Sequence, residues 1–251
     1  MSRRTRAVTG AAFAVGFEGL LRAVNSDVGR WQRTNHRGAP VSLLSGPALA
    51  MAAALTGGNA PAAVAALAAA AVGAYDDVAG SADKGVRGHL AALREGRLTS
   101  GVVKVAGLGV VGLATTLLRP GRRRLPDLLV DAGLVAGSAN LLNLFDLRPG
   151  RALKVGLVTA FALDLPGPAG AGLGLLRSDL RERSMLGDAG ANAYGALLGA
   201  ALAGRVAAQS RRIAALGVLV ALTAASELVS YSTVIDATPP LRWADRLGRL
   251  A

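Results

Sequence analysis

Long apolar segments separated by short polar loops run through all 251 residues, and they most restrict what this chain can fold into. A helix needs about 20 mostly apolar residues to cross a bilayer, with a lower limit near 17. Backbone groups in hydrocarbon must be hydrogen-bonded within the protein, so such segments predict helices. We therefore expect an all-α, polytopic integral membrane helical bundle with about nine transmembrane helices, and eight as the alternative. The candidate spans are 7–24, 40–57, 60–75, 100–118, 127–145, 152–164, 166–176, 190–204 and 213–232.

Several of these spans are short. The segment Leu165-Pro166-Gly167-Pro168 between 152–164 and 166–176 fits a broken hairpin as well as two full crossings. The basic start of the chain resembles a signal peptide, but Glu18 and Arg22 interrupt the apolar run, which predicts a retained first helix. The pattern shows no internal repeat and no separable soluble stretch, so 1–251 is predicted to form a single domain.

The charge distribution favours a membrane over nucleic acid. The net charge is +12, but the arginines lie in short loops between apolar runs rather than along one face, which predicts no nucleic-acid partner. Nine crossings place five segments on one side, and the positive charges favour the cytoplasm for that side, although the cluster at 119–124 opposes this. The five segments are 25–39, 76–99, 146–151, 177–189 and the tail from 236. The chain has no cysteine, which excludes thiol catalysis and disulfides.

Acidic residues lie where apolar spans meet polar loops. Asp76 and Asp77 end the third span, where a helix C-terminus already carries partial negative charge, so the pair needs a cation or a basic group. A solvated helix end is the simpler interpretation. Asp188, between glycines at the start of the eighth span, either binds a ligand or caps the helix.

The fifth span carries Asn140, Asn143 and Asp146 at a spacing of three, and we expect them to line one face. Such polar groups need partners inside the protein, and hydrogen bonds between helices are the alternative to a site. Arg148 follows in a turn and brings a basic side chain beside Asp146.

Basic residues complete the predicted site. Lys104 lies within an apolar span and favours a phosphate or carboxylate partner. Arg37 and the basic loop at 84–89 fit phosphate binding or simple membrane topology. Oxygen ligands suit Mg²⁺, with Mn²⁺ as an alternative, and Mg²⁺ normally shares its site with substrate phosphates.

The order of these motifs resembles the polyprenyl-phosphate N-acetylhexosamine-1-phosphate transferase superfamily, the family of phospho-N-acetylmuramoyl-pentapeptide transferase. The resemblance runs from about Arg33 to Glu227. It rests on the aspartate pair, on the Asn/Asp motif of the fifth span, and on Gly187-Asp188-x-Gly190 before the eighth. The chain departs from the family pattern in three ways. Pro149 stands where the family often has a further aspartate, and Met185 stands roughly where an aromatic residue stacks on the nucleobase. The family's histidine-rich loop and final span are not found.

The resemblance implies a magnesium-dependent glycosyl-1-phosphate transferase in the bacterial cytoplasmic membrane, with its active site facing the cytoplasm. It would transfer a sugar phosphate from a UDP-N-acetylhexosamine to polyprenyl phosphate, release UMP and serve cell-wall or surface-glycan synthesis. The expected partners are the UDP-sugar, polyprenyl phosphate and the bilayer, and a homodimer is left open. A degenerate homologue that binds lipid phosphate or a membrane partner without catalysis is the alternative.

The resemblance also assigns roles to residues. Catalysis is expected from Asp76, Asp77 and Asp188, and Mg²⁺ binding from Asp188 and Asp146. Substrate binding is expected from Arg37, Lys104, Asn140, Asn143, Asp146 and Arg148.

Overall fold

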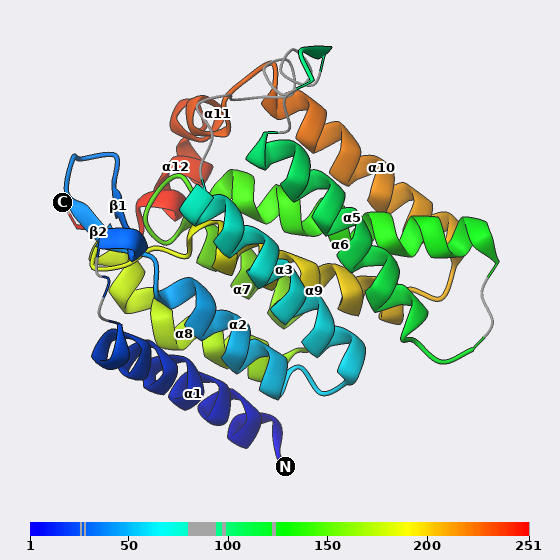
Figure 1. Ribbon diagram of the computed structural model, residues 1–251, viewed down its shortest axis with the longest axis horizontal. Helices are drawn as coiled ribbons and strands as arrows, with labels where there is room; N and C mark the ends of the chain where they lie inside the picture. Colours follow the sequence, from blue (N-terminus) through cyan, green and yellow to red (C-terminus); the bar gives the residue numbers. More distant parts are fainter. Residues whose placement is uncertain (26, 28, 80–93, 97–98, 122–123, 251) are drawn as a thin grey trace.

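The computed structural model describes residues 1–25, 27, 29–79, 94–96, 99–121 and 124–250 (Figure 1). Within these ranges the chain forms eleven α-helices, a short 3-10 helix and one two-stranded antiparallel sheet. The long helices are α1 (Arg3–Val24), α2 (Ser45–Thr56), α3 (Ala60–Ala79), α5 (Ser100–Leu117), α6 (Leu125–Phe145), α7 (Arg151–Ala162), α8 (Pro166–Leu180), α9 (Gly187–Arg205) and α10 (Gln209–Ser226). The short elements are η1 (Gly29–Trp31), β1 (Gln32–Thr34), β2 (Pro40–Ser42), α11 (Tyr231–Ala237) and α12 (Pro239–Arg246).

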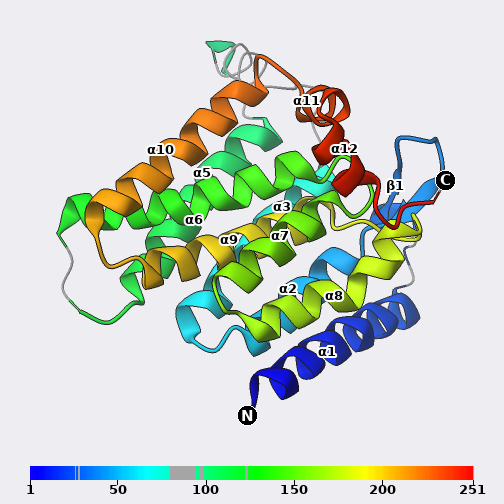
Figure 2. The ribbon, with the colours of Figure 1, turned by 180° about the vertical axis from the view of Figure 1, so that it is seen from behind.

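Helix α9 is the centre of the bundle. It packs against α2, α3 and α6, while α1 lies along α8 at one edge and α10 lies along α6 at the other (Figures 1 and 2). Most of α9 is buried, including Tyr194, whose hydroxyl donates a hydrogen bond to the Pro168 carbonyl at 3.1 Å. The predicted all-α class is confirmed for the described part of the chain.

Small residues let these helices approach closely. A Cβ on Gly170 of α8 would overlap the carbonyl oxygen of Ala7 on α1, and a Cβ on Gly195 of α9 would overlap that of Ser138 on α6. In membrane proteins, where apolar burial between helices gains little over lipid, such close backbone packing is a main source of helix association. The glycine and alanine residues of the chain therefore allow the close contacts at these helix interfaces.

Among the described residues, four helices are long and apolar enough to cross a membrane: α1, α3, α5 and α6. Helix α10 shows the corresponding surface, because within Gln209–Ser226 its buried residue is Arg212 while Ile213, Val218 and Val220 point outward. A soluble helix has the opposite arrangement, with apolar residues inward. The fold is thus consistent with a membrane protein.

The count of nine spans is not confirmed. In the part of the chain described, four helices qualify, or five if α10 and α11 count as one span, although these two are bent by 92° at their junction. Helices α2, α7 and α8 have 12, 12 and 15 residues, or roughly 18–22 Å at 1.5 Å per residue, which is shorter than the hydrocarbon core of about 30 Å. The predicted span 40–57 begins with strand β2, where Val41 pairs with Arg33.

The hairpin alternative at Leu165–Pro168 agrees with the structure. Helices α7 and α8 are separate, pack on each other, and are joined through Leu163–Leu165, where Asp164 adopts a left-handed φ of 48°. Proline at the start of α8 fits this break, because the ring cannot continue a preceding helix.

Four of the five segments expected on one side meet at one end of the bundle. The hairpin β1–β2 contacts the 177–189 segment through Asn35, which donates to Glu182 at 2.6 Å, and Arg37 donates to the Leu250 carbonyl at 3.3 Å. Arg249 of the tail donates to the Pro149 carbonyl at 2.9 Å. For the segment 76–99, α3 continues to Ala79, while residues 80–93 and 97–98, including the basic loop at 84–89, lie outside the described residues.

At the opposite end, Arg119 of the 119–124 cluster, which counted against the predicted orientation, and Arg212 of α10 are partners of acidic residues on α6. Arg119 contacts Asp131 at 3.2 Å, and Arg212 contacts Asp131 at 2.6 Å and Asp127 at 2.9 Å. Asp131 is fully buried between α5, α6 and α10. These charges stabilise helix packing, so the loop-charge comparison overstated the positive charge at this end.

We predict that Gly170→Ala weakens the packing of α1 on α8, because the added methyl overlaps the Ala7 carbonyl and the two backbones must separate. Overpacking of this kind typically costs about 1–3 kcal/mol. Thermal unfolding in detergent should therefore begin at a lower temperature. Gly16→Ala on α1 is the control, because a Cβ there would meet no neighbouring helix within 4 Å; equal melting of both variants would contradict the prediction.

Candidate functional site

Asp77 connects the end of α3 to the start of α9. Its two carboxylate oxygens accept the backbone N–H groups of Asp188 at 3.1 Å and Ala189 at 2.9 Å. The first N–H groups of a helix have no partner within the helix and carry partial positive charge, so a carboxylate there is stabilised. Arg33 of the hairpin adds a contact to the same carboxylate at 3.2 Å. Asp77, rather than Asp188, therefore caps α9.

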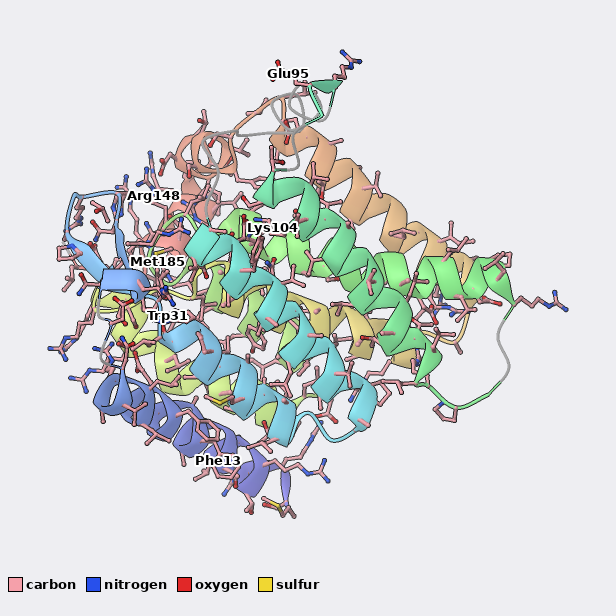
Figure 3. The ribbon with its side chains drawn as sticks, in the orientation of Figure 1. Phe13, Trp31, Glu95, Lys104, Arg148 and Met185 are labelled. Atoms are coloured by element: carbon pink, nitrogen blue, oxygen red, sulfur yellow. The ribbon has the colours of Figure 1, made fainter. Side chains whose placement is uncertain are left out.

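Lys104 joins the other two aspartates of this group. Its ammonium lies 2.6 Å from Asp76 Oδ2 and 3.1 Å from Asp188 Oδ2, so one cation bridges α3, α5 and α9. Lys104 lies toward the end of the bundle that carries Arg148 and Met185 (Figure 3). A phosphate or a carboxylate was expected as the partner of Lys104, and the structure shows carboxylates. Lys104 is also the basic group that Asp76 was expected to need.

Two glycines make this approach of helices sterically possible. A Cβ on Gly73 of α3 would overlap the Asp188 carbonyl, and Gly187 has a left-handed φ of 61° directly before Asp188. A side chain at Gly187 would also press on the Asp77 carboxylate, 2.9 Å from its Cβ position. The glycines beside Asp188 are thus required by backbone geometry around the aspartates.

Asp146 lies beside this cluster. It follows α6, is buried, and accepts a hydrogen bond from the Gly187 N–H, while its Oδ2 is buried without a hydrogen-bond partner. Burial raises the pKa of Asp146 well above its ordinary value, and the negative charge of nearby Asp179 raises it further, although the Gly187 amide opposes the shift. The four predicted aspartates therefore converge, as expected, at one end of the bundle.

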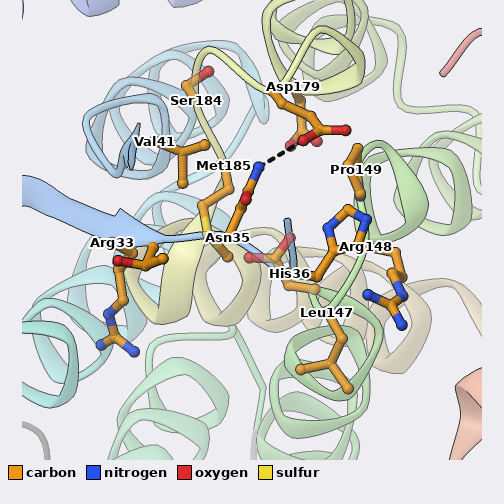
Figure 4. A pocket seen from close by; sticks show the side chains of 13 residues that line it. Arg33, Asn35, His36, Val41, Leu147, Arg148, Pro149, Asp179, Ser184 and Met185 are labelled. Carbon is orange, nitrogen blue, oxygen red and sulfur yellow. Dashed lines mark hydrogen bonds between the residues drawn. The ribbon is translucent and has the colours of Figure 1, made fainter. Parts of the chain in front are cut away.

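A cavity of about 200 Å³ opens next to Asp146 (Figure 4). Its polar lining includes Arg33, Asn35, His36, Asp146, Arg148, Asp179, Glu182 and Ser184, and Met185 contributes an apolar wall. Burial and the Arg148 charge lower the pKa of His36, so the imidazole is mainly neutral at neutral pH. The cavity is smaller than the roughly 300–1,000 Å³ of sites that enclose a whole ligand, so it suits one part of a larger substrate.

The predicted basic residues occupy different positions. Arg148 lines the cavity beside His36, as Figure 4 shows. Arg37 lies at its rim, where it contacts Glu182 at 3.4 Å, and Arg33 is the arginine that reaches Asp77. Glu182 therefore already balances one of the proposed phosphate ligands.

The prediction that Asn140 shares one face of α6 with Asn143 and Asp146 is not confirmed. At about 100° per residue, Asn140 and Asn143 lie about 60° apart around α6, whereas Asp146 is the C-cap residue beyond the helix, with a ψ of 41°. Asn140 instead donates to Thr223 Oγ1 of α10 at 3.4 Å, the interhelical bond that was the alternative. Asn143 lies between them, and its carbonyl accepts the Asp146 N–H at 3.0 Å.

Sequence reasoning missed the acidic side of the cavity. Asp179 is buried at the end of α8 and accepts the Gly150 N–H at 2.6 Å, and Ser184 is buried beside it. The polar run from Arg177 to Ser184, between two apolar helices, is the signal that would have indicated these residues.

Tail residues were missed as well. Asp245 of α12 forms a two-point contact with Arg151, through Nε at 2.8 Å and Nη2 at 3.1 Å, and Arg249 binds the same carboxylate. Burial opposes ionisation of Asp245, but hydrogen bonding and charge from Arg151 and Arg249 outweigh it and lower the pKa. No spacing in the sequence indicates this pairing, because its partners are about 90 residues apart.

The residues fit magnesium only as a partial ligand set. The described residues contain no group of three or more carboxylate, histidine or cysteine side chains placed to hold a metal ion. Mg²⁺ is usually held by one or two carboxylates together with waters and substrate phosphates. The buried, unpartnered Oδ2 of Asp146 is an oxygen ligand of the required kind.

Comparison of the chain with protein-family models and with curated proteins gave no match.

We predict that Lys104→Met destabilises the protein by about 3 kcal/mol, because removing one partner of a buried ion pair leaves the other charge uncompensated. Chemical denaturation in mixed micelles measures the loss. Adding Asp76→Asn should restore part of it, as expected for coupled residues. Lys154→Met is the control, because Lys154 donates to the carbonyls of Ala244 and Asp245 rather than to carboxylates. An equal loss in both lysine variants would refute the special role of Lys104.

We predict that Asp146→Asn stabilises the protein at neutral pH. An acid whose pKa is raised by folding favours the folded state when protonated, and this contribution is lost as pH rises through the folded pKa. Asparagine keeps the acceptor for Gly187 without the charge. The melting temperature of the variant should thus exceed that of the wild type at pH 8, and the difference should shrink toward pH 4. A difference independent of pH would show that charge burial is not its cause.

Proposed function

We propose that this chain is a polytopic membrane enzyme of the polyprenyl-phosphate N-acetylhexosamine-1-phosphate transferase type. It would transfer a sugar phosphate from a UDP-N-acetylhexosamine to polyprenyl phosphate and release UMP. The observation that carries the proposal is the convergence of Asp76, Asp77, Asp146 and Asp188 with Lys104 at one end of a bundle of membrane-type helices. Ionisable groups so placed are costly, and in membrane proteins they usually mark a functional site.

The reaction joins two anions. An oxygen of the lipid phosphate attacks the sugar-side phosphorus of the pyrophosphate, a new P–O bond forms, and the bond from that phosphorus to the bridging oxygen breaks to release UMP. Positioning and neutralisation of charge are the main contributions that a protein can make to such a step. Lys104, beside Asp188, and Arg148, in the cavity beside Asp146, supply positive charge.

The aspartates take separate roles in this proposal. Asp77 holds the start of α9 and so positions Asp188. Asp76, paired with Lys104, orients the lipid phosphate or accepts its proton. Asp188 and Asp146 would hold Mg²⁺, or Mn²⁺ in its place, and the bound ion supplies charge stabilisation to the departing phosphate.

The cavity beside Asp146 would receive the nucleotide. Its size suits one part of a UDP-sugar, and the imidazole of His36, which lines the cavity, offers a donor and an acceptor to a base or ribose. The sugar and the pyrophosphate would then extend toward Lys104 and Asp188. This arrangement belongs at the cytoplasmic face of the bacterial plasma membrane, where nucleotide sugars are available.

A second candidate, a homologue that binds lipid phosphate without transfer, is favoured by one observation. Protein groups already balance three of the carboxylates: Lys104 pairs with Asp76 and Asp188, and Arg33 with the α9 amides serves Asp77. Such a protein would be stabilised against heat by polyprenyl phosphate but not by any UDP-sugar.

We predict that Asp188→Asn lowers Mg²⁺-dependent UMP release at least 10²-fold, the usual cost of losing one transition-state contact. A screen of radiolabelled UDP-N-acetylhexosamines with polyprenyl phosphate in liposomes first identifies the donor and then compares the variants. Asp164→Asn is the control, because Asp164 pairs with Arg3 at the far end of the bundle.

Undiminished turnover in Asp188→Asn would remove that residue from the reaction. No UMP release by the wild-type protein with any donor, together with thermal stabilisation by polyprenyl phosphate alone, would favour the binding protein over the enzyme.

A further inference from the structure

The C-terminal segment turns sideways at the site end of the bundle. Helix α11 is bent by 92° from α10, and the ring of Tyr231 at its start stacks on Phe145, the last residue of α6, with 4.8 Å between ring centroids. Tyr231 also donates its hydroxyl hydrogen to the Leu222 carbonyl at 2.7 Å. Helices α11 and α12 therefore begin at the level where the candidate span α6 ends (Figure 2).

The inner face of α12 is fixed to the bundle. Arg151 and Asp245, which are 3% and 7% exposed, form the two-point ion pair described above, and Lys154 donates to the Asp245 carbonyl at 2.7 Å. A buried pair of this geometry holds α12 in one orientation, because displacing it would leave a buried guanidinium without its partner. The outer face of α12 consequently points in a defined direction.

That outer face combines an aromatic residue, an apolar residue and positive charge. Trp243 is 69% exposed and Leu247 is 56% exposed, although both are large apolar side chains. With Arg242 and Arg246 they line an open groove of about 510 Å³ that Pro239 and Gly248 complete. Arg242 also donates to the Asp236 carbonyl at 3.2 Å, which orients its guanidinium.

These features match the boundary between lipid headgroups and acyl chains. Tryptophan concentrates at that boundary because its ring is largely apolar and its N–H is polar. Arginine binds phosphate oxygens through two N–H groups at once. A helix with these two faces, lying at the ends of membrane-type helices, has the composition of interfacial segments that bind anionic lipids.

We propose that the outer groove of α12 binds the headgroup of an anionic phospholipid. Trp243 and Leu247 contact the start of the acyl chains, and Arg242 and Arg246 contact the phosphate. The same segment reaches the cavity rim, because Arg249 donates to the Pro149 carbonyl and Arg37 donates to that of Leu250. A bound lipid therefore restrains a segment that contacts the cavity lining at Pro149, whatever reaction the cavity serves.

Trp243 itself reports on the test, because the chain has only two tryptophans. The full chain with Trp31→Phe is reconstituted in nanodiscs of phosphatidylcholine and phosphatidylglycerol, with equal amounts of bromine on the acyl chains of one lipid or the other. Bromine quenches tryptophan fluorescence only on close approach. We expect stronger quenching when phosphatidylglycerol carries the bromine, and loss of that difference in Arg242→Gln/Arg246→Gln.

The control variant Arg4→Gln/Arg6→Gln removes the same charge at the far end of the bundle and should keep the preference. Quenching by brominated phosphatidylcholine should persist in Arg242→Gln/Arg246→Gln, which shows that α12 is still in place. No quenching by either lipid would place Trp243 in water and overturn the proposal. Equal quenching by the two lipids in the Trp31→Phe protein would show that the groove does not select an anionic headgroup.

Discussion

The cost of burying charge in an apolar bundle governs this structure. A carboxylate removed from water needs a counter-charge or several hydrogen-bond donors, or it takes up a proton. Lys104 meets this requirement for two helices at once, because its ammonium lies between Asp76 and Asp188. The ends of α3, α5 and α9 are thereby held in one arrangement, and Asp146 lies between it and the cavity.

The same constraint recurs at two other places in the described chain. At the far end, Asp131 is buried between Arg119 and Arg212, and at the tail Asp245 is buried against Arg151. Each network joins segments that are distant in sequence, and each lies where helices end rather than along their middles. Between the helix ends, glycine and alanine residues let the helix backbones pack closely. Ionic contacts at the helix ends and close backbone packing along the helices together specify the fold.

The helices and the acidic residues at their ends could be predicted from the sequence. The number of crossings and the partners of individual side chains could not, because they depend on contacts between helices. Apolar segments indicate the helices, and acids at their ends indicate the site, because both follow from transfer energies of single side chains. The number of crossings does not follow, because α2 and α7 are short helices within a bundle and need not span it alone. Which residue caps α9 depends on contact between α3 and α9, and the direction of Asn140 depends on a helical phase that a spacing of three only approximates.

The carboxylates of the site differ in how many hydrogen bonds and ion pairs the protein already provides to them. This difference affects how a divalent ion would bind. Asp77 is occupied by two helix amides and Arg33, and Asp76 and Asp188 share Lys104. Asp146 keeps a buried oxygen without a hydrogen-bond partner, at the boundary between this cluster and the cavity. An ion bound there would have to draw Asp188 away from Lys104, which becomes favourable when a substrate phosphate offers the ammonium another anion. Ion and substrate would then bind more tightly together than separately, by a linkage that runs through the single lysine between the two carboxylates.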